Sequence, residues 1–237
     1  MTTNRTYSSQ RLLAAVALTV ATLAPDCRAA AARVPLKIAK IYWEYNASAN
    51  DLGVHVSLDG EDWRRLKIVN PKDRTIFAVE GKGPYKDLGM TELFFEGAEP
   101  SLADFPLAKL LGLFPEGQYL MVGKQVDGRE TGSAVAFSHA IPAGPVVSAT
   151  VGPNNSLVIS WTQVTAPPIG FPAKPINIAG YQVIVGLFLV TLPATATSVT
   201  VPPEFVASLT PGVQPYEVLA IEANNNQTLT EGTFVKP

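Results

Sequence analysis

The segment 156–161 constrains the fold of this chain more than any other, because its side chains alternate in character. Leu157, Ile159 and Trp161 are large and apolar, and the residues between them are smaller or polar. Successive side chains of a strand point to opposite faces of a sheet, so this pattern predicts a strand with one face in a hydrophobic core. We therefore expect Trp161 to be buried between two sheets.

Several other segments of the C-terminal half are typical of strands. They are rich in apolar and β-branched residues and are separated by glycine, proline and asparagine, which favour turns. The predicted strands are 146–151, 157–163, 178–185, 187–191, 198–202, 216–223 and 228–235. Seven short strands with frequent turns predict a β-sandwich.

Trp161 is followed by Gly180-Tyr181-Gln182-Val183, and then by the turn Leu209-Thr210-Pro211-Gly212 ahead of Tyr216. This combination resembles a fibronectin type III domain over residues 144–237. The resemblance implies a seven-stranded sandwich. Two residues depart from the family pattern: Tyr216 lies four residues after Gly212 where three is usual, and Glu222 falls where a small inward-facing residue is expected.

Residues 36–140 predict a second all-β domain, which is only loosely immunoglobulin-like. Its first strand has alternating apolar side chains between residues 39 and 45. The segments 54–58 and 66–69 are predicted to form a hairpin with its turn at Asp59-Gly60. Further strands are predicted over 74–80, 90–96 and 133–138, and the apolar spacing after Pro106 predicts a short helix over 107–112.

Two tyrosines occupy similar places in the two predicted domains. Tyr119 and Tyr216 each follow a turn with proline and glycine and begin a late strand. In immunoglobulin-like sandwiches such a tyrosine donates its hydroxyl to a backbone group a few residues upstream. We expect the acceptor for Tyr119 within 111–114 and that for Tyr216 within 209–211. The sequence thus predicts two tandem immunoglobulin-like sandwiches, 36–140 and 144–237, joined by a short linker.

The first 31 residues have the features of a bacterial export signal, with arginines, an apolar run over 12–24 and small residues over 29–32. The run is shorter than the roughly 20 residues of a membrane-spanning helix. We expect removal of this segment and a soluble periplasmic or extracellular protein without a membrane span. Cys27, the only cysteine, would be removed with it. The alternative, a lipid anchor on Cys27, is disfavoured by Asp26, which stands where a small residue is expected.

Charge is nearly balanced, with 18 Lys and Arg against 20 Asp and Glu and a net charge of -2. Nucleic-acid binding needs clustered cations, so it is excluded as an expected function. Residues 36–142 hold 12 Lys and Arg and 15 Asp and Glu, whereas residues 143–237 hold 2 and 4. Any polar recognition is therefore expected in the first domain.

No motif predicts a catalytic, cofactor-binding or metal-ligating residue. His55 and His139 are the only histidines and are not spaced as metal ligands, so both are interpreted as surface residues. Oxygen-bearing side chains in two loops raise the alternative of a calcium site, but they lack the spacing of a calcium-binding loop and are interpreted as solvated turns. These side chains are Asn46, Asn50 and Asp51 in one loop and Asp59, Glu61 and Asp62 in the other.

Tyr42 and Trp63 are the candidates for an exposed aromatic platform that could stack on a sugar, although core or rim packing is the commoner role of such residues. Two glycosylation sequons, at Asn46 and Asn226, matter only in a eukaryotic secretory pathway. We expect an exported, non-catalytic binding or spacer module whose protein or glycan ligand is unknown. The alternatives are a carbohydrate-binding accessory module and a small secreted hydrolase.

Overall fold

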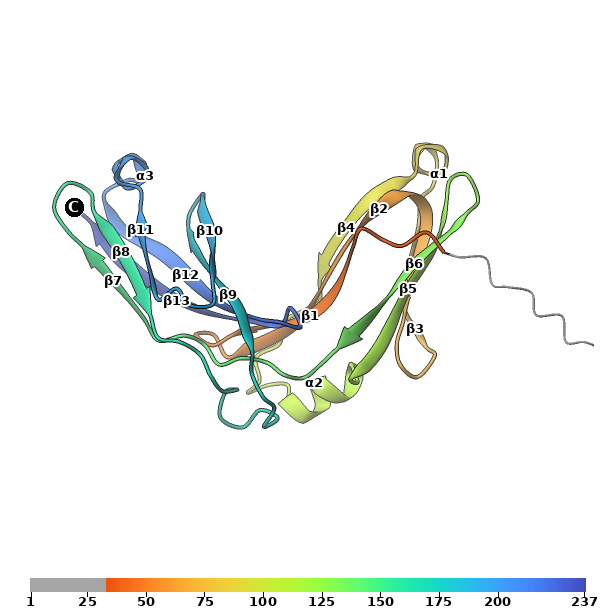
Figure 1. The fold of residues 1–237 in the computed structure, drawn as a ribbon, viewed down its shortest axis with the longest axis horizontal. Helices are drawn as coiled ribbons and strands as arrows, with labels where there is room; N and C mark the ends of the chain where they lie inside the picture. The colour runs from red at the N-terminus through yellow and green to blue at the C-terminus, as the bar shows by residue number, and fades with distance from the viewer. Residues whose placement is uncertain (1–32) are drawn as a thin grey trace, which may run out of the picture. The chain divides into compact units, whose positions relative to one another are not determined.

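The structure is a computed structural model that describes residues 33–237. The predicted export signal over residues 1–31, with Cys27, lies outside the described residues. Strands dominate the described part of the chain and form one ten-stranded and one three-stranded sheet (Figure 1). The predicted all-β fold class is confirmed.

The C-terminal half contains seven strands in two layers that enclose one core. One layer has the order β11-β8-β7 and comprises β7 (Val147–Val151), β8 (Leu157–Trp161) and β11 (Ser198–Val201). The other has the order β10-β9-β12-β13 and comprises β9 (Ile178–Val185), β10 (Phe188–Pro193), β12 (Gly212–Glu222) and β13 (Gln227–Lys236). The seven-stranded sandwich that the fibronectin type III resemblance implies is confirmed.

Strand β8 supplies the centre of this core. Leu157 and Ile159 are completely buried and Trp161 is 5% exposed, which confirms the predicted burial. The Trp161 ring lies 5.5 Å from the Tyr181 ring of the opposite layer, measured between centroids. Burying a large apolar side chain stabilises a fold by about 1.5–3 kcal/mol, so these side chains hold the two layers together.

The N-terminal half is organised around one long strand, β2. The first part of β2 pairs with β1 and β4, and its second part pairs with β3 and β5. The two layers therefore share β2, and the core between them brings the Trp43 and Phe137 rings to 5.4 Å. The strands are β1 (Ile38–Asn46), β2 (Asp51–Val69), β3 (Thr75–Glu80), β4 (Met90–Glu96), β5 (Gly117–Gln125) and β6 (Glu130–Phe137).

The predicted hairpin turn at Asp59-Gly60 is wrong, because β2 continues through both residues. Its pairing with β4 is irregular between Asp59 and Trp63, so the strand bends there instead of reversing. A Cβ on Gly60 would lie 2.9 Å from the Leu36 side chain, which shows that glycine serves close packing at this position. Trp63 then pairs with both β4 and β5 and is completely buried at the bend.

The two halves are joined by a parallel strand pair. Glu44 to Asn46 of β1 pair with Gln227 to Leu229 of β13, so strands of both halves belong to the ten-stranded sheet. Each half nevertheless has its own cluster of buried apolar residues. The division into domains at 36–140 and 144–237 stays a prediction.

The helices are short, namely α1 (Pro84–Leu88), α2 (Leu107–Leu113) and α3 (Pro203–Ser208). The helix expected over 107–112 is confirmed by α2, which begins directly after Pro106. Leu110 is its buried residue and packs α2 onto the N-terminal core.

Tyr119 and Tyr216, which were predicted to occupy similar places, differ in their hydrogen bonds. The Tyr119 hydroxyl donates to the carbonyl of Pro115 at 3.0 Å, one residue beyond the predicted range 111–114. Within residues 33–237 the Tyr216 hydroxyl makes no hydrogen bond to the turn at 209–211, so that prediction is wrong. Tyr216 pairs across the strand with Gly232, where any Cβ would collide with the phenol. The extra residue after Gly212 accounts for this different placement.

Candidate functional site

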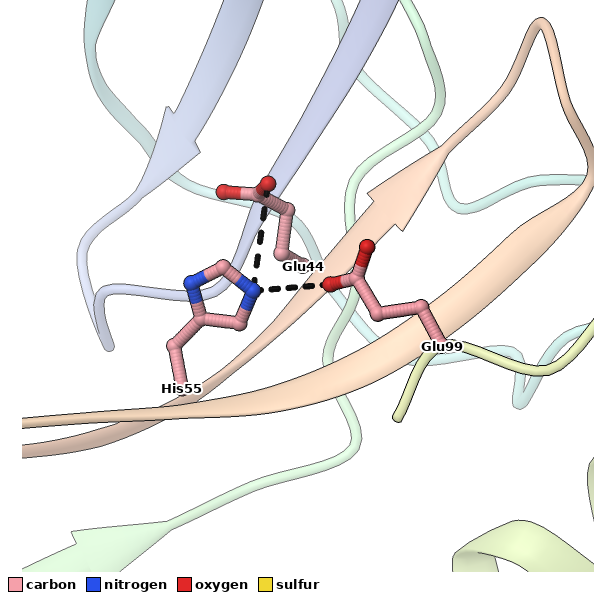
Figure 2. A group of neighbouring side chains, drawn as sticks. All are labelled: Glu44, His55 and Glu99. Atoms are coloured by element: carbon pink, nitrogen blue, oxygen red, sulfur yellow. Dashed lines mark hydrogen bonds and ion pairs between the residues drawn. The ribbon is translucent and has the colours of Figure 1, made fainter. Parts of the chain in front are cut away.

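A buried histidine surrounded by three carboxylates lies on the outer face of the N-terminal sheet. Strand register places it there, because Tyr42 of β1 and Glu96 of β4 both pair with His55 of β2. Glu44 lies two residues after Tyr42 on β1 and points to the same face. Figure 2 shows Glu44 and Glu99 approaching the imidazole ring. We call this group the His55 cluster: Glu44, His55, Glu96 and Glu99.

All three carboxylates approach the same ring nitrogen. The His55 Nε2 atom lies 2.8 Å from Glu99 Oε1, 3.9 Å from Glu44 Oε1 and 3.8 Å from Glu96 Oε2. One nitrogen carries at most one hydrogen, so it satisfies the Glu99 oxygen and leaves the other two carboxylates without a hydrogen bond from the ring. No lysine or arginine forms an ion pair with these carboxylates in the described part of the chain. The His55 cluster therefore has an excess of negative charge.

Burial strengthens the electrostatic effects within the cluster. The side chain of His55 is 5% exposed, that of Glu44 17% and that of Glu99 32%. Burial raises the pKa of the Glu44 carboxyl, and His55 and the Gln227 amide partly offset this rise. The negative charges of Glu99 and Glu96 raise the pKa of Glu44 further. The negative charge of the Glu44 carboxylate is thus not fully compensated by its neighbours.

Two aromatic rings flank the histidine. The Tyr42 ring lies 5.4 Å and the Phe94 ring 6.0 Å from the His55 ring, between centroids. Burial raises the pKa of the Tyr42 phenol to about 12, and the charges of Glu44 and Glu96 act in the same direction. Tyr42 therefore lines the cluster as a neutral phenol.

Gly53 makes room for one of the carboxylates. It pairs with Glu44 within the β1 and β2 ladder, and glycine ordinarily weakens the interior of a strand. A Cβ on Gly53 would lie 2.5 Å from Glu99 Cγ and 2.6 Å from Glu99 Oε1. The glycine is thus required for Glu99 to pass over β2 and reach His55.

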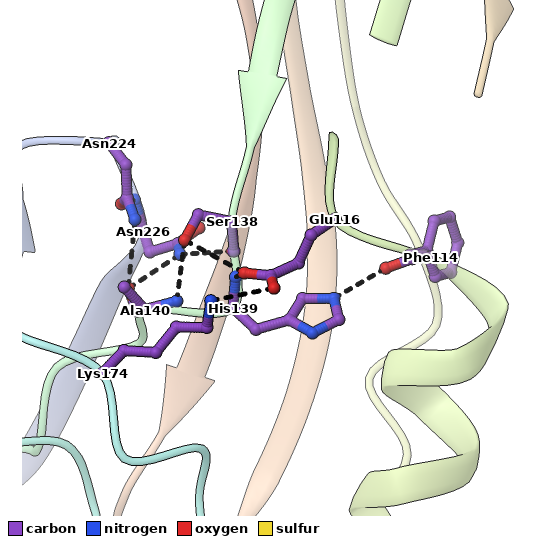
Figure 3. A network of polar contacts seen from close by, with 8 residues as sticks. All are labelled: Phe114, Glu116, Ser138, His139, Ala140, Lys174, Asn224 and Asn226. Carbon is purple, nitrogen blue, oxygen red and sulfur yellow. Dashed lines mark hydrogen bonds and ion pairs between the residues drawn. The ribbon is translucent and has the colours of Figure 1, made fainter. Parts of the chain in front are cut away.

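A second polar group lies where the two halves meet (Figure 3). Asn226 is 1% exposed, and its Oδ1 atom accepts a hydrogen bond of 2.9 Å from the Trp43 amide. Its Nδ2 atom donates to the carbonyls of Ser138 at 2.8 Å and Ala140 at 2.9 Å. The Asn226 side chain thus connects the turn before β13 to β1 and to the segment after β6. This burial also removes Asn226 from the surface on which glycosylation would occur.

Glu116 extends this network. One oxygen accepts from the His139 amide at 2.6 Å and the other pairs with Lys174 at 2.9 Å. The His139 Nε2 atom lies 2.8 Å from the carbonyl oxygen of Phe114. We call the residues drawn in Figure 3 the junction network: Phe114, Glu116, Ser138, His139, Ala140, Lys174, Asn224 and Asn226.

Glu222 explains one departure from the fibronectin type III pattern. It is 6% exposed, and its carboxylate accepts hydrogen bonds from the amides of Asn177 at 3.2 Å and Asn224 at 2.6 Å. A buried carboxylate with two backbone donors replaces the small residue expected there.

The structure corrects several expectations about site residues. His55 is buried rather than on the surface, and His139 is half-buried. Trp63 is completely buried and Tyr42 is half-buried, so the two do not form an exposed sugar platform. Trp63 is buried because it lies at the bend of β2, where strand pairing on both sides encloses it.

The two oxygen-rich loops are not brought together. Asn46 pairs with Asp51 at one end of the β1 and β2 ladder, and Asp59 pairs with Ile38 at the other end. Asn46 Oδ1 accepts from the amides of Ser48 and Ala49, which is ordinary turn chemistry, and Asp59 forms an ion pair with Lys37 at 3.3 Å. Glu61 and Asp62 follow Asp59 at the same end of the ladder.

Sequence reasoning missed the His55 cluster because its members come from three separate segments. The pairing of β1 with β2 places Tyr42 and His55 side by side and was open to prediction. The register of β4 and the path of the segment that carries Glu99 could not be predicted from the sequence. Three side chains within residues 33–237 bring their possible metal-ligating atoms to within 4.8 Å of one another. They are Glu44, His55 and Glu99.

A cavity of about 590 Å³ lies elsewhere, over β2, β3 and β5. Basic side chains of Arg33, Arg65 and Lys67 line it together with the acidic Glu80 and Glu130. This mixed lining does not favour one class of charged ligand.

No protein-family model and no curated protein matches the chain. Among solved structures, it is similar to a two-domain fibronectin type III segment of chicken tenascin, with 15% identity over 85% of this chain and 99% of that one, at a TM-score of 0.29. Fibronectin(III)-like modules of Clostridium thermocellum CbhA match with 11% identity over 83% of this chain and 90% of that one, also at a TM-score of 0.29. The Clostridium perfringens spore cortex lytic enzyme SleM matches with 18% identity and a TM-score of 0.33, but the match covers 40% of this chain and only 28% of SleM.

No helix within residues 33–237 has the length and apolar character needed to cross a membrane.

Proposed function

We propose that this chain is an exported, non-catalytic binding or spacer module. The observation that supports this most directly is the parallel pairing of β1 with β13 over three residue pairs, which joins two β-structured halves into one sheet. The buried side chain of Asn226, which belongs to the C-terminal half, also bonds at this joint to three backbone groups of the N-terminal half. A joint made of ladder hydrogen bonds and buried polar contacts favours a stiff module over two freely moving domains.

The alternatives have less support in the structure. The carbohydrate-binding alternative rested on Tyr42 and Trp63, and Trp63 is buried. A hydrolase of the kind considered needs a histidine within reach of both a carboxylate and a hydroxyl. In the described part of the chain, His55 contacts Glu99 and His139 contacts a backbone carbonyl, and neither ring hydrogen-bonds to a hydroxyl.

The stiffness of the joint can be tested by a distance measurement across it. We would place spin labels on cysteines introduced at Lys86 in α1 and Glu204 in α3, which are exposed and lie in different halves, in a Cys27→Ser background. A narrow distance distribution by pulsed electron resonance is expected, and it should broaden when Asn226→Ala is added. A broad distribution in the background protein itself would contradict the proposal of a spacer module.

A further inference from the structure

We propose that the His55 cluster is a binding site for a divalent metal ion of the zinc class, with His55 Nε2 and carboxylate oxygens of Glu44 and Glu99 as ligands. Imidazole nitrogen and carboxylate oxygen together are a donor set typical of Zn²⁺. Calcium and magnesium prefer sites made of oxygen alone, so a buried imidazole at the centre disfavours them. This inference does not depend on the proposed function.

The spacing of the donors fits an ion with little rearrangement. Zinc binds nitrogen and oxygen at about 2.0–2.2 Å, so donors of a tetrahedral site lie about 3.4 Å apart. In the His55 cluster Nε2 lies 2.8 Å from the Glu99 oxygen and 3.9 Å from the Glu44 oxygen, and the donors all fall within 4.8 Å of one another. These distances bracket the required value. Small side-chain rotations would therefore complete the geometry.

Charge and burial also point to a cation. Three carboxylates converge on one ring nitrogen, and within residues 33–237 no lysine or arginine pairs with any of them. Glu96 is 60% exposed at its side chain and lies 3.8 Å from Nε2, so it is placed to rotate inward as a further ligand. A divalent ion would compensate this charge, and it would bind neutral His55, releasing any proton from Nε2 to solvent.

Neighbouring residues hold the ligands in place. The Gln227 amide on β13 donates to Glu44 Oε2, which leaves Glu44 Oε1 directed at His55. Gly53 leaves the space that Glu99 occupies over β2. Residues that orient metal ligands in this way are a regular feature of metal sites. Glu44 itself belongs to the strand pair that joins the two halves, because it pairs with Gln227 across β1 and β13.

The test is calorimetric titration of the full chain with ZnCl₂. The protein is prepared without a polyhistidine tag, treated with EDTA and dialysed, and all variants carry Cys27→Ser so that the only cysteine cannot bind zinc. We expect one zinc ion per chain. His55→Gln and Glu99→Gln should each weaken binding at least tenfold, while the matched control His139→Gln, which alters the other histidine of the chain, should bind as the parent does.

Gly53→Ala separates a metal site from a merely acidic surface, because it retains every donor and displaces only Glu99. We expect it to weaken zinc binding at least tenfold while the far-ultraviolet circular dichroism keeps its β-sheet form. If His55→Gln does not fold, Glu99→Gln and Gly53→Ala decide the question. Absence of zinc binding, equal binding by these variants and the parent, or equal affinity for CaCl₂ and ZnCl₂ would each overturn the proposal.

Discussion

Replacing Asn226 by alanine should destabilise the whole protein, because its side chain reaches from the C-terminal half to satisfy backbone groups of the N-terminal half. The change removes the acceptor for the Trp43 amide and the donor to the Ser138 carbonyl. The Ala140 carbonyl retains a weaker partner, the Asn224 side chain at 3.2 Å. A buried backbone group without a partner costs about 1–3 kcal/mol, so two such groups predict a loss of about 2–6 kcal/mol.

The assay is urea unfolding followed by circular dichroism and tryptophan fluorescence. Asn224→Ala is the matched control, since Asn224 lies in the same turn and is less buried. Its side chain donates the longer bond to Ala140 at 3.2 Å and accepts one of 2.8 Å from the Asn226 amide within the turn, but it bonds neither to Trp43 nor to Ser138. We expect this control to lose about 1–2 kcal/mol. A loss below 1 kcal/mol for Asn226→Ala, or one no greater than that of Asn224→Ala, would refute the argument that Asn226 secures the joint.

Three further predictions concern stability. Trp161→Ala should lower the free energy of unfolding by about 3–5 kcal/mol, since it empties the centre of the C-terminal core, and a loss under 1 kcal/mol in urea would contradict the observed packing. Tyr119→Phe should cost about 1–2 kcal/mol by leaving the Pro115 carbonyl without its donor, whereas Tyr216→Phe should be near neutral; equal losses would contradict the difference between the two corners. Although burial opposes it, the hydrogen bond from the His139 amide and the contact with Lys174 lower the pKa of Glu116 below its ordinary value of 4.5. Glu116→Gln should therefore be less stable than the parent at pH 7 by under about 1 kcal/mol, because solvent screens a half-exposed ion pair. The difference in stability should disappear as the pH falls through the lowered pKa of Glu116. A difference that persists at about pH 2 would contradict this account.

The sequence predicted the C-terminal sandwich well because local patterns determine it. Alternation in β8 and turn residues between strands indicate where each strand lies, and Trp161 occupies the predicted buried position. The prediction for Tyr216 was wrong, because one added residue after Gly212 changes which neighbour the ring contacts.

The N-terminal half was harder to predict because its bend depends on contacts distant in sequence. Asp59-Gly60 is a typical turn pair, yet packing of Leu36 against Gly60 and pairing of Trp63 on both edges keep β2 continuous. The His55 cluster depends on the same kind of information. Polar character alone suggested that His55 faces solvent, whereas Glu99 and the flanking rings cover it.

The pairing of β1 with β13 is the central claim, and amide hydrogen exchange of the full chain tests it most directly. The Ala47 amide donates to the Leu229 carbonyl at 2.9 Å across this joint. If the two halves share one sheet, this amide should exchange slowly, with protection comparable to that of Ile159 and Val183 inside the C-terminal sandwich. Exchange of Ala47 at the rate of an open loop, while those core amides remain protected, would show that the halves are not joined in this way.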